Sequence, residues 1–162
     1  MLTDAYIGLG SNLNQPLKQI AAALTQIDEI DRTVLQNISS MYLSRPMGPQ
    51  DQPPYVNAVA QIATQLTPHE LLLHLNRIEI EHGRLRQGAR WGPRTLDLDI
   101  LVYGNLSFKD QALTIPHPGI KSREFVLYPL HEVNKNLMIP NLGLVSRIKS
   151  RRYVNGMRRL QL

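Results

Sequence analysis

The segment 96–103 alternates between two kinds of side chain, as a β-strand with two different faces does. One face carries Leu96, Leu98, Ile100 and Val102, and the other carries Asp97, Asp99, Leu101 and Tyr103. A core strand seldom holds two carboxylates on one face, because burying unpaired charge costs several kcal/mol. The pattern predicts either a functional pair of acids or a solvated edge strand whose acids pair with nearby arginines. The strand alone leaves both interpretations open.

Asp97 and Asp99 have a spacing that suits metal binding. Residues i and i+2 of a strand point the same way, ~6–7 Å apart, so their carboxylates can bridge hard cations, including two ions about 3.5–4 Å apart. The chain has no cysteine, and oxygen ligands favour Mg²⁺, which adds water and substrate phosphate as ligands. The preceding segment 83–94 holds four arginines and no acid. Arginines beside such carboxylates suit phosphoryl transfer, so the two features together favour a site.

The composition predicts one globular domain spanning residues 1–162. Hydrophobic residues make up 43% of the chain and charged residues 19%, which is typical of a soluble protein. The lack of cysteine favours the cytoplasm, and neither a signal peptide nor a membrane span is recognisable. The net charge of +5 comes from a basic tail at about 147–162, since the other residues include 12 basic and 13 acidic ones. We expect removal of 150–162 to leave catalysis largely intact.

The order of the predicted elements favours an α+β fold with a ferredoxin-like βαββαβ core, an antiparallel sheet with helices packed against it. Strands are predicted at 4–9, 33–43, 55–65 and 96–103. One helix has Asn14 as its N-cap, and another starts at a capping box from Thr67 to Glu70. Their apolar stripes are Leu17, Ile20, Ala21, Leu24 and Ile27, and Leu71, Leu72, Leu75, Ile78 and His82. Further on we expect a hairpin at 106–115, a helix after Pro129 and another at about 143–152.

Several residues have more than one interpretation when only their spacing is considered. The segment 8–12, with glycines at 8 and 10, is typical of a phosphate loop or of a tight turn with a structural Asn12, and the turn is favoured because the third glycine and the Gly-Lys of known phosphate motifs are missing. Trp91 fits a core plug or a cover for a planar ligand. Without further information, Tyr55, Asn57 and Phe125 are packing residues.

Three motifs resolve this ambiguity by resemblance. Gly10-Ser11-Asn12-Leu13, the segment 46–53 (Pro-x-Gly-Pro-Gln-Asp-Gln-Pro) and the segment 90–101 (Arg-Trp-Gly-Pro-Arg-Thr-Leu-Asp-Leu-Asp-Ile-Leu) occur in the order and spacing of the hydroxymethyldihydropterin pyrophosphokinases of folate biosynthesis. Ile115-Pro116-His117 and Arg123-x-Phe125 extend this match. The chain resembles that family from about residue 5 to residue 132, and the Trp-Gly-Pro-Arg-x-x-Asp-Leu-Asp block is highly specific.

The resemblance implies transfer of pyrophosphate from ATP to the hydroxymethyl group of the dihydropterin, with release of AMP. It implies that Asp97 and Asp99 hold two Mg²⁺ ions and act in catalysis with Arg84 and Arg94. The implied pterin-binding residues are Ser44, Arg45, Met47, Tyr55, Asn57, Asp97 and Phe125. The implied ATP-binding residues are Leu72, Asn76, Glu79, Arg84, Arg86, Trp91, Arg94, Ile100, Thr114, His117 and Arg123. The expected partners are these two small molecules, with no nucleic acid and no membrane, and the expected state is a monomer.

The chain departs from the family pattern at three positions: Ser44 replaces a threonine, Arg45 a proline, and Pro118 an aromatic residue. These changes bear on ligand affinity rather than on the transfer step. Two other functions are considered, an RNA-binding ferredoxin-like module and a two-metal phosphohydrolase or nuclease that uses Asp97 and Asp99. The first lacks the aromatic strand motif of such modules. Incubation with magnesium and ATP, with and without the dihydropterin, separates all three functions.

Overall fold

The computed structural model describes residues 1–45, 52–83, 95–150 and 157–160. Six strands form the main sheet in the order β10-β3-β4-β1-β5, with β2 also paired to β4, and each of these pairings is antiparallel. Its strands are β1 (Thr3–Ser11), β2 (Thr33–Ile38), β3 (Tyr42–Ser44), β4 (Tyr55–Thr64), β5 (Asp97–Tyr103) and β10 (Arg158–Arg159). The longest of them, β4, is paired on both sides.

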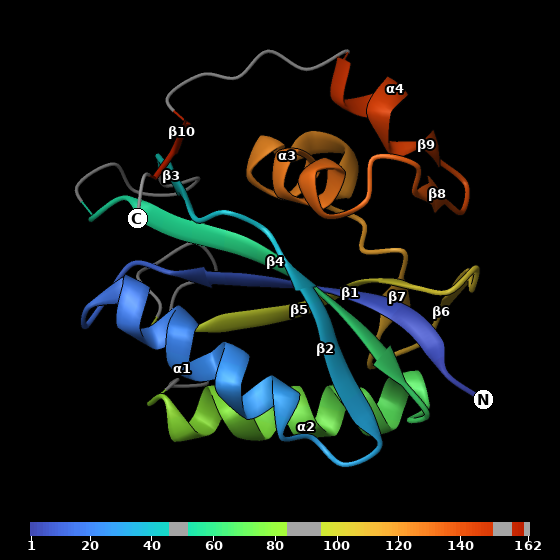
Figure 1. Cartoon of the computed structure of the whole chain (residues 1–162), viewed down its shortest axis with the longest axis horizontal. Helices are drawn as coiled ribbons and strands as arrows, with labels where there is room; N and C mark the ends of the chain where they lie inside the picture. Colours follow the sequence, from blue (N-terminus) through green and yellow to red (C-terminus); the bar gives the residue numbers. More distant parts are fainter. Residues whose placement is uncertain (46–51, 84–94, 151–156, 161–162) are drawn as a thin grey trace.

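Helices cover both faces of the sheet (Figure 1). Helices α1 (Pro16–Asp28) and α2 (Pro68–Glu81) lie on one face, and α3 (Glu124–Val133) and α4 (Val145–Ser150) lie on the other. Each face therefore has its own apolar cluster, one containing Ile7, Ile20 and Leu75 and the other containing Tyr6, Leu101 and Leu127. The predicted ferredoxin-like α+β core is confirmed, and the C-terminal helices add a third layer to it. Within the described residues, no helix is long and apolar enough to cross a bilayer.

The first helix differs in detail from its prediction. Its N-cap is Gln15 rather than Asn14, and both residues have left-handed backbone angles with no side-chain cap. Its buried residues are Ile20, Ala23, Leu24 and Ile27. Leu17 and Ala21 are exposed, because the stripe that meets the sheet follows the spacing i, i+3, i+4, i+7 from Ile20.

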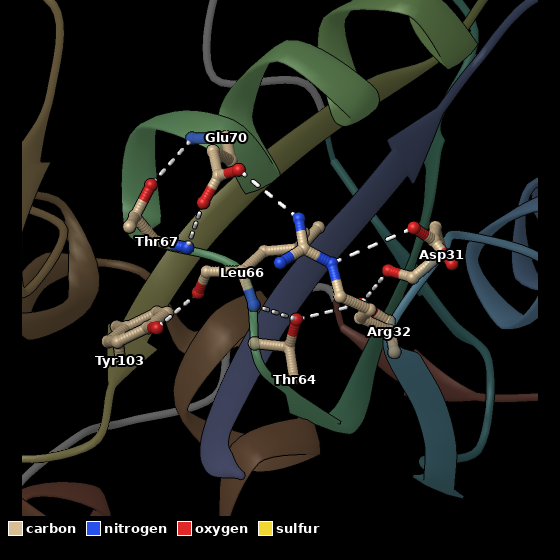
Figure 2. A network of polar contacts seen from close by, with 8 residues as sticks. Asp31, Arg32, Thr64, Leu66, Thr67, Glu70 and Tyr103 are labelled. Atoms are coloured by element: carbon tan, nitrogen blue, oxygen red, sulfur yellow. Dashed lines mark hydrogen bonds and ion pairs between the residues drawn. The ribbon is translucent and has the colours of Figure 1, made fainter. Parts of the chain in front are cut away.

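The second helix begins with the predicted capping box. The Thr67 hydroxyl accepts a hydrogen bond from the Glu70 N–H, and the Glu70 carboxylate accepts one from the Thr67 N–H. Arg32, just before β2, contacts the same carboxylate at 3.3 Å, and the Tyr103 hydroxyl donates to the Leu66 carbonyl (Figure 2). Of the predicted stripe, Leu71, Leu75 and Ile78 are buried and Leu72 is half-buried, whereas His82 is the C-cap and its ring hydrogen-bonds to two glutamines of α1. This network ties the end of β4 and the end of β5 to the start of α2.

A β-bulge changes the predicted faces of β5. The register pairs Tyr6 with Val102 and Ile7 with Ile100, so Leu101 is skipped. An extra residue on one strand shifts the alternation that follows it. Val102 therefore joins Leu101 in the cluster under α3, and Tyr103 joins the cluster under α1 and α2. The prediction was wrong for these two side chains and right for 96–101.

The segment predicted as one strand at 33–43 is two strands, because Ser39 interrupts it. The Ser39 N–H donates to the Val59 carbonyl, and its hydroxyl accepts from the Val59 N–H. A side chain thus replaces one hydrogen bond of the ladder. The register moves by one residue between the pairs Ile38–Ala60 and Tyr42–Asn57, and β3 begins as a separate short strand.

The C-terminal elements agree only partly with their predictions. The hairpin expected at 106–115 is present as β6 (Phe108–Lys109) and β7 (Thr114–Ile115), and η1 (Ile120–Ser122) follows it. Helix α3 contains Pro129 rather than starting after it, because Val126, Leu127 and Leu130 bury their side chains under the sheet. A small hairpin, β8 (Met138–Ile139) with β9 (Gly143–Leu144), precedes α4, which lies within the predicted range 143–152.

Candidate active site

Gly10 lies at the centre of a row of three residues across neighbouring strands. It pairs with Asn57 of β4 on one side and with Asp97 of β5 on the other. Two strand spacings separate Asn57 from Asp97, or about 10 Å. A Cβ on Gly10 would lie 2.9 Å from Asn57 Oδ1, so glycine leaves room for the amide. The segment 8–10 is thus part of β1, and the tight turn expected here was wrong.

Asn12 is the structural residue that the turn hypothesis expected. It is 2% exposed, and its Nδ2 donates to Gln52 Oε1 and to the Pro53 carbonyl, both at 2.9 Å. These bonds fasten the residues that precede Tyr55 to the end of β1. The sequence did not predict the contact between Asn12 and Gln52, because a motif match does not show which residues of the motifs touch each other.

Asn57 and Ser44 form a buried polar pair beside Gly10. Asn57 Nδ2 donates to Ser44 Oγ at 2.9 Å, and the two side chains are 5% and 6% exposed. A hydroxyl that accepts one hydrogen bond can still donate its own hydrogen. Tyr55 lies close by, with its Cδ1 at 4.0 Å from the position of a Gly10 Cβ. The predicted pterin residues Ser44, Tyr55 and Asn57 therefore lie together, and Arg45 is exposed next to them.

Asp97 and Asp99 lie on the same face of the sheet as Leu101, which is the face that carries α3. The Asp99 side chain is about half exposed, at 47%. Its Oδ1 is 4.0 Å from His117 Nε2. Strand β5 is the last strand in the described order of the sheet, which agrees with the interpretation of 96–103 as an edge strand. Asp99 is nevertheless not fully solvated, because His117 lies beside its carboxylate.

His117 is held beside Asp99 by backbone contacts. Its N–H donates to the carbonyl of Leu101, the residue skipped by the bulge, at 2.9 Å. Its Nδ1 accepts a hydrogen bond from the Gly119 N–H at 2.9 Å. A neutral ring therefore carries its proton on Nε2, the atom that faces Asp99. Burial lowers the pKa of His117, the negative charge of Asp99 raises it by less, and the positive charge of Arg123 lowers it further. The neutral form of His117 is therefore favoured near pH 7.

Arg123 and Phe125 meet at the start of α3. The Arg123 guanidinium carbon is 5.9 Å from the centre of the Phe125 ring. Gly119 makes this position possible, because a Cβ there would lie 2.6 Å from Arg123 Nε. Gly119 was missed by the sequence analysis. Its position in the sequence, between His117 and Arg123, could have indicated it, but the two matched motifs leave the residues between them out.

The predicted nucleotide residues of α2 pack beside β5. Glu79 is buried and its Oε2 accepts the N–H of Leu98 at 2.8 Å, which holds the outer side of β5 between the two aspartates. Leu72 and Asn76 are half-buried on the same helix, Thr114 is half-buried on β7, and Ile100 is buried in the cluster under α2. Five further predicted residues lie outside the described residues: Met47, Arg84, Arg86, Trp91 and Arg94.

Comparisons with known proteins identify the family. The model of the 7,8-dihydro-6-hydroxymethylpterin-pyrophosphokinase family matches residues 6–135. A 2-amino-4-hydroxy-6-hydroxymethyldihydropteridine pyrophosphokinase of Haemophilus influenzae is 54% identical over 147 residues, which is 91% of each chain. The protein of that name from Pseudomonas aeruginosa is 46% identical over 141 residues, or 87% of this chain and 86% of that one.

A solved structure supports the fold independently. Wild-type HPPK-DHPS of Plasmodium falciparum with pteroate superposes with a TM-score of 0.72 over 93% of this chain, at 12% sequence identity. The match spans 42% of that longer chain, and at this identity it shows the fold alone. The family model and the two close relatives carry the assignment: the chain belongs to the 7,8-dihydro-6-hydroxymethylpterin-pyrophosphokinase family.

Proposed function

We propose that this chain transfers pyrophosphate from ATP to the hydroxymethyl group of 6-hydroxymethyl-7,8-dihydropterin at the row formed by Asn57, Gly10 and Asp97. Membership of the family supports the reaction. The row supports the place, because Gly10 separates the backbone of Asn57 from that of Asp97 by two strand spacings, or about 10 Å. That span suits a two-ring heterocycle whose one-carbon arm points at Asp97.

The pterin is bound by the β3–β4 side of the row. Asn57 and Ser44 offer hydrogen-bonding groups in a fixed orientation to the polar edge of the ring. Tyr55 and Phe125 supply aromatic faces for its plane, and Arg45 and Met47 complete the wall. ATP is bound from the other side by Leu72, Asn76, Glu79, Ile100 and Thr114.

Asp97 and Asp99 fit Mg²⁺ by the chemistry of their donors. Both are carboxylates on one face of β5, and a half-exposed position leaves room for water and phosphate oxygens. The described residues contain no group of three or more acidic, histidine or cysteine side chains that could hold a metal ion by themselves, and Mg²⁺ bound with a nucleotide needs only one or two carboxylates. We propose two such ions. When bound, they neutralise the charge that develops on the phosphates.

The chain's own residues then position the two substrates. Asp97 accepts the hydrogen bond of the pterin hydroxyl and aims its oxygen at the β-phosphorus of ATP. A new oxygen–phosphorus bond forms as the hydroxyl loses its proton by way of Asp97 to water, while the bond from the β-phosphorus to the bridging oxygen of the α-phosphate breaks, so AMP leaves with that oxygen. His117, through Nε2–H, and the cations of Arg123, Arg84 and Arg94 stabilise the phosphate oxygens.

We also propose that the enzyme acts in the cytoplasm as a monomer. Both of its proposed substrates are small molecules. Neither nucleic acid nor a membrane has a part in this reaction.

Incubation with magnesium and ATP, with and without the dihydropterin, tests the proposed function. Pyrophosphokinase activity gives AMP only when the pterin is present, in a one-to-one ratio with pterin diphosphate. Release of AMP or phosphate without pterin would instead indicate a phosphohydrolase. No turnover, together with retention of RNA on the protein, would indicate a binding module.

A further inference from the structure

Strand β3 carries Ser44 but is too short to be held firmly by β4 alone. It has three residues, and its pairs with β4 are Tyr42–Asn57, Leu43–Val56 and Ser44–Tyr55. Ser39 interrupts the ladder on its N-terminal side. A two-stranded contact of this length is marginal in water, so the position of Ser44 depends on other contacts of β3.

Glu132 of α3 binds the start of β3 with both of its carboxylate oxygens. Oε2 accepts the Ser40 N–H at 3.0 Å and the Ser40 hydroxyl at 2.7 Å. Oε1 accepts the Tyr42 hydroxyl at 2.6 Å. Three hydrogen bonds to one carboxylate, two of them shorter than 2.8 Å, are strong because the acceptor is ionised. One side chain thereby fixes residues 40–42 to the helix that carries Phe125.

The C-terminal strand β10 holds the other side of β3 (Figure 1). Arg158 pairs with Leu43 and Arg159 with Tyr42, and the Leu160 N–H donates to the Met41 carbonyl at 2.8 Å. The charge of Arg159 also acts on Glu132 and Tyr42. Residues 41–43 are thus enclosed between β4, α3 and β10. We call Glu132 together with β10 the β3 brace.

We infer that the β3 brace is a positioning device for the pterin pocket, which sets the place of Ser44 and, through it, of the Asn57 amide. Ser44 lies two residues beyond Tyr42, and Asn57 reaches it by a 2.9 Å hydrogen bond. Asn57 is also the strand partner of Tyr42. Movement of β3 therefore moves both polar groups that read the ring. This inference rests on the proposed function, and it replaces the expectation that the basic tail is dispensable for catalysis.

The test compares four variants in the full enzyme. Glu132→Ala removes the carboxylate, Glu132→Gln keeps one acceptor oxygen, and a chain ending at Met157 lacks β10. Tyr42→Phe removes one hydroxyl and is the mildest change. The matched control is Tyr103→Phe, which removes the tyrosine hydroxyl bound to the Leu66 carbonyl at the opposite end of the sheet. Thermal unfolding of each variant is measured beside the KM values for pterin and ATP and the dissociation constant of pterin.

We expect Glu132→Ala and the shortened chain to raise the KM for pterin by roughly ten- to a hundredfold, as a misplacement of about 1 Å can do. The KM for ATP should change far less. Tyr42→Phe and Glu132→Gln should give smaller changes of the same kind, and Tyr103→Phe should lower stability without changing either KM.

Two results would overturn the inference. One is an unchanged pterin KM in folded Tyr42→Phe, Glu132→Gln and shortened proteins. The other is a change of equal size in Tyr103→Phe, which would show that stability alone governs the pocket. Wild-type enzyme without pterin-dependent AMP release would overturn the proposed function, and the inference with it. Pterin-dependent release in the wild type with no effect of the variants would overturn the inference alone.

Discussion

The amide of Asn57 is oriented by Ser44, since Asn57 Nδ2 donates to Ser44 Oγ at 2.9 Å. This hydrogen bond turns Asn57 Oδ1 toward Gly10, where a Cβ would lie 2.9 Å away. Both side chains are buried, so the pair cannot rotate freely toward water. The specificity of the proposed pterin pocket thus depends on a strand contact between β3 and β4 as well as on the residues that touch the ring.

Gly10→Ala should weaken pterin binding by about 1 kcal/mol or more, which is roughly a fivefold to tenfold loss of affinity. The new methyl group would force Asn57 to leave Ser44 or to shift its oxygen. Gly8→Ala is the matched control on the same strand and face, because the nearest atoms to its Cβ would be those of the Leu101 side chain, at 3.3 Å, and not Asn57. Calorimetric titration with pterin measures both. Equal losses in the two variants would show that the effect is one of packing in β1.

Gly119→Ala should raise the KM for ATP about tenfold while leaving the pterin KM nearly unchanged, because its Cβ would displace the Arg123 guanidinium. The backbone at Gly119 has φ −86, which alanine adopts easily, so the substitution acts on Arg123 rather than on the turn. Arg123→Ala should have the same effect, and the double variant should add nothing to it. Additive losses would mean that Gly119 acts through another residue.

Thr67→Ala should destabilise the protein by roughly 1 kcal/mol, the usual cost of losing an N-cap. The Thr67 hydroxyl caps α2 in the network of Figure 2, and this lies at the opposite end of the strands from the site. Denaturant unfolding measures the loss. Thr25→Ala, within α1, caps no helix and should cost little. A changed KM in Thr67→Ala would mean that the cap influences the site.

The stability of the β3 brace should fall in acid. Partial burial acts to raise the pKa of Glu132, but hydrogen bonds from Tyr42 and Ser40 and the charge of Arg159 hold it below the usual 4.5. A carboxyl whose pKa is lower in the folded state stabilises the fold above its unfolded pKa, and this contribution is lost as the pH falls through the folded pKa. The difference in unfolding free energy between wild type and Glu132→Gln should therefore shrink below about pH 4.5. A difference in unfolding free energy that stays constant as the pH falls to the pKa of Glu132 in the folded protein would contradict this prediction.

The sequence predicts the parts of this fold that depend on local patterns. The capping box at Thr67 and the alternation from Leu96 to Leu101 both hold in the structure. Both signals are local, because the residues involved are neighbours along the chain. The predicted site residues that lie close together, such as Ser44 and Asn57, came from resemblance to a family rather than from spacing.

The remaining features depend on contacts between distant segments. The bulge at Leu101 follows from pairing with β1 and changes the faces of Val102 and Tyr103. Strand β10 has no apolar alternation and exists because β3 offers it an edge. Helix α3 runs through Pro129 because burial of its neighbours outweighs the lost hydrogen bond. Each of these features depends on residues far apart in the sequence, so no local pattern predicts it.

In the proposed reaction, Asp97 and Asp99 are the carboxylates at which pyrophosphate transfer takes place. The most direct measurement is pterin-dependent AMP release by Asp97→Asn and Asp99→Asn over a range of magnesium concentrations, with circular dichroism to confirm folding. The control is Asp31→Asn, whose side chain is 83% exposed and which precedes β2 at the end of the sheet opposite Asp97. We predict a loss on the order of 10²-fold or more in each site variant, because a neutral amide binds Mg²⁺ poorly, and no loss in the control. Turnover close to that of the wild type in either folded site variant would contradict the assignment.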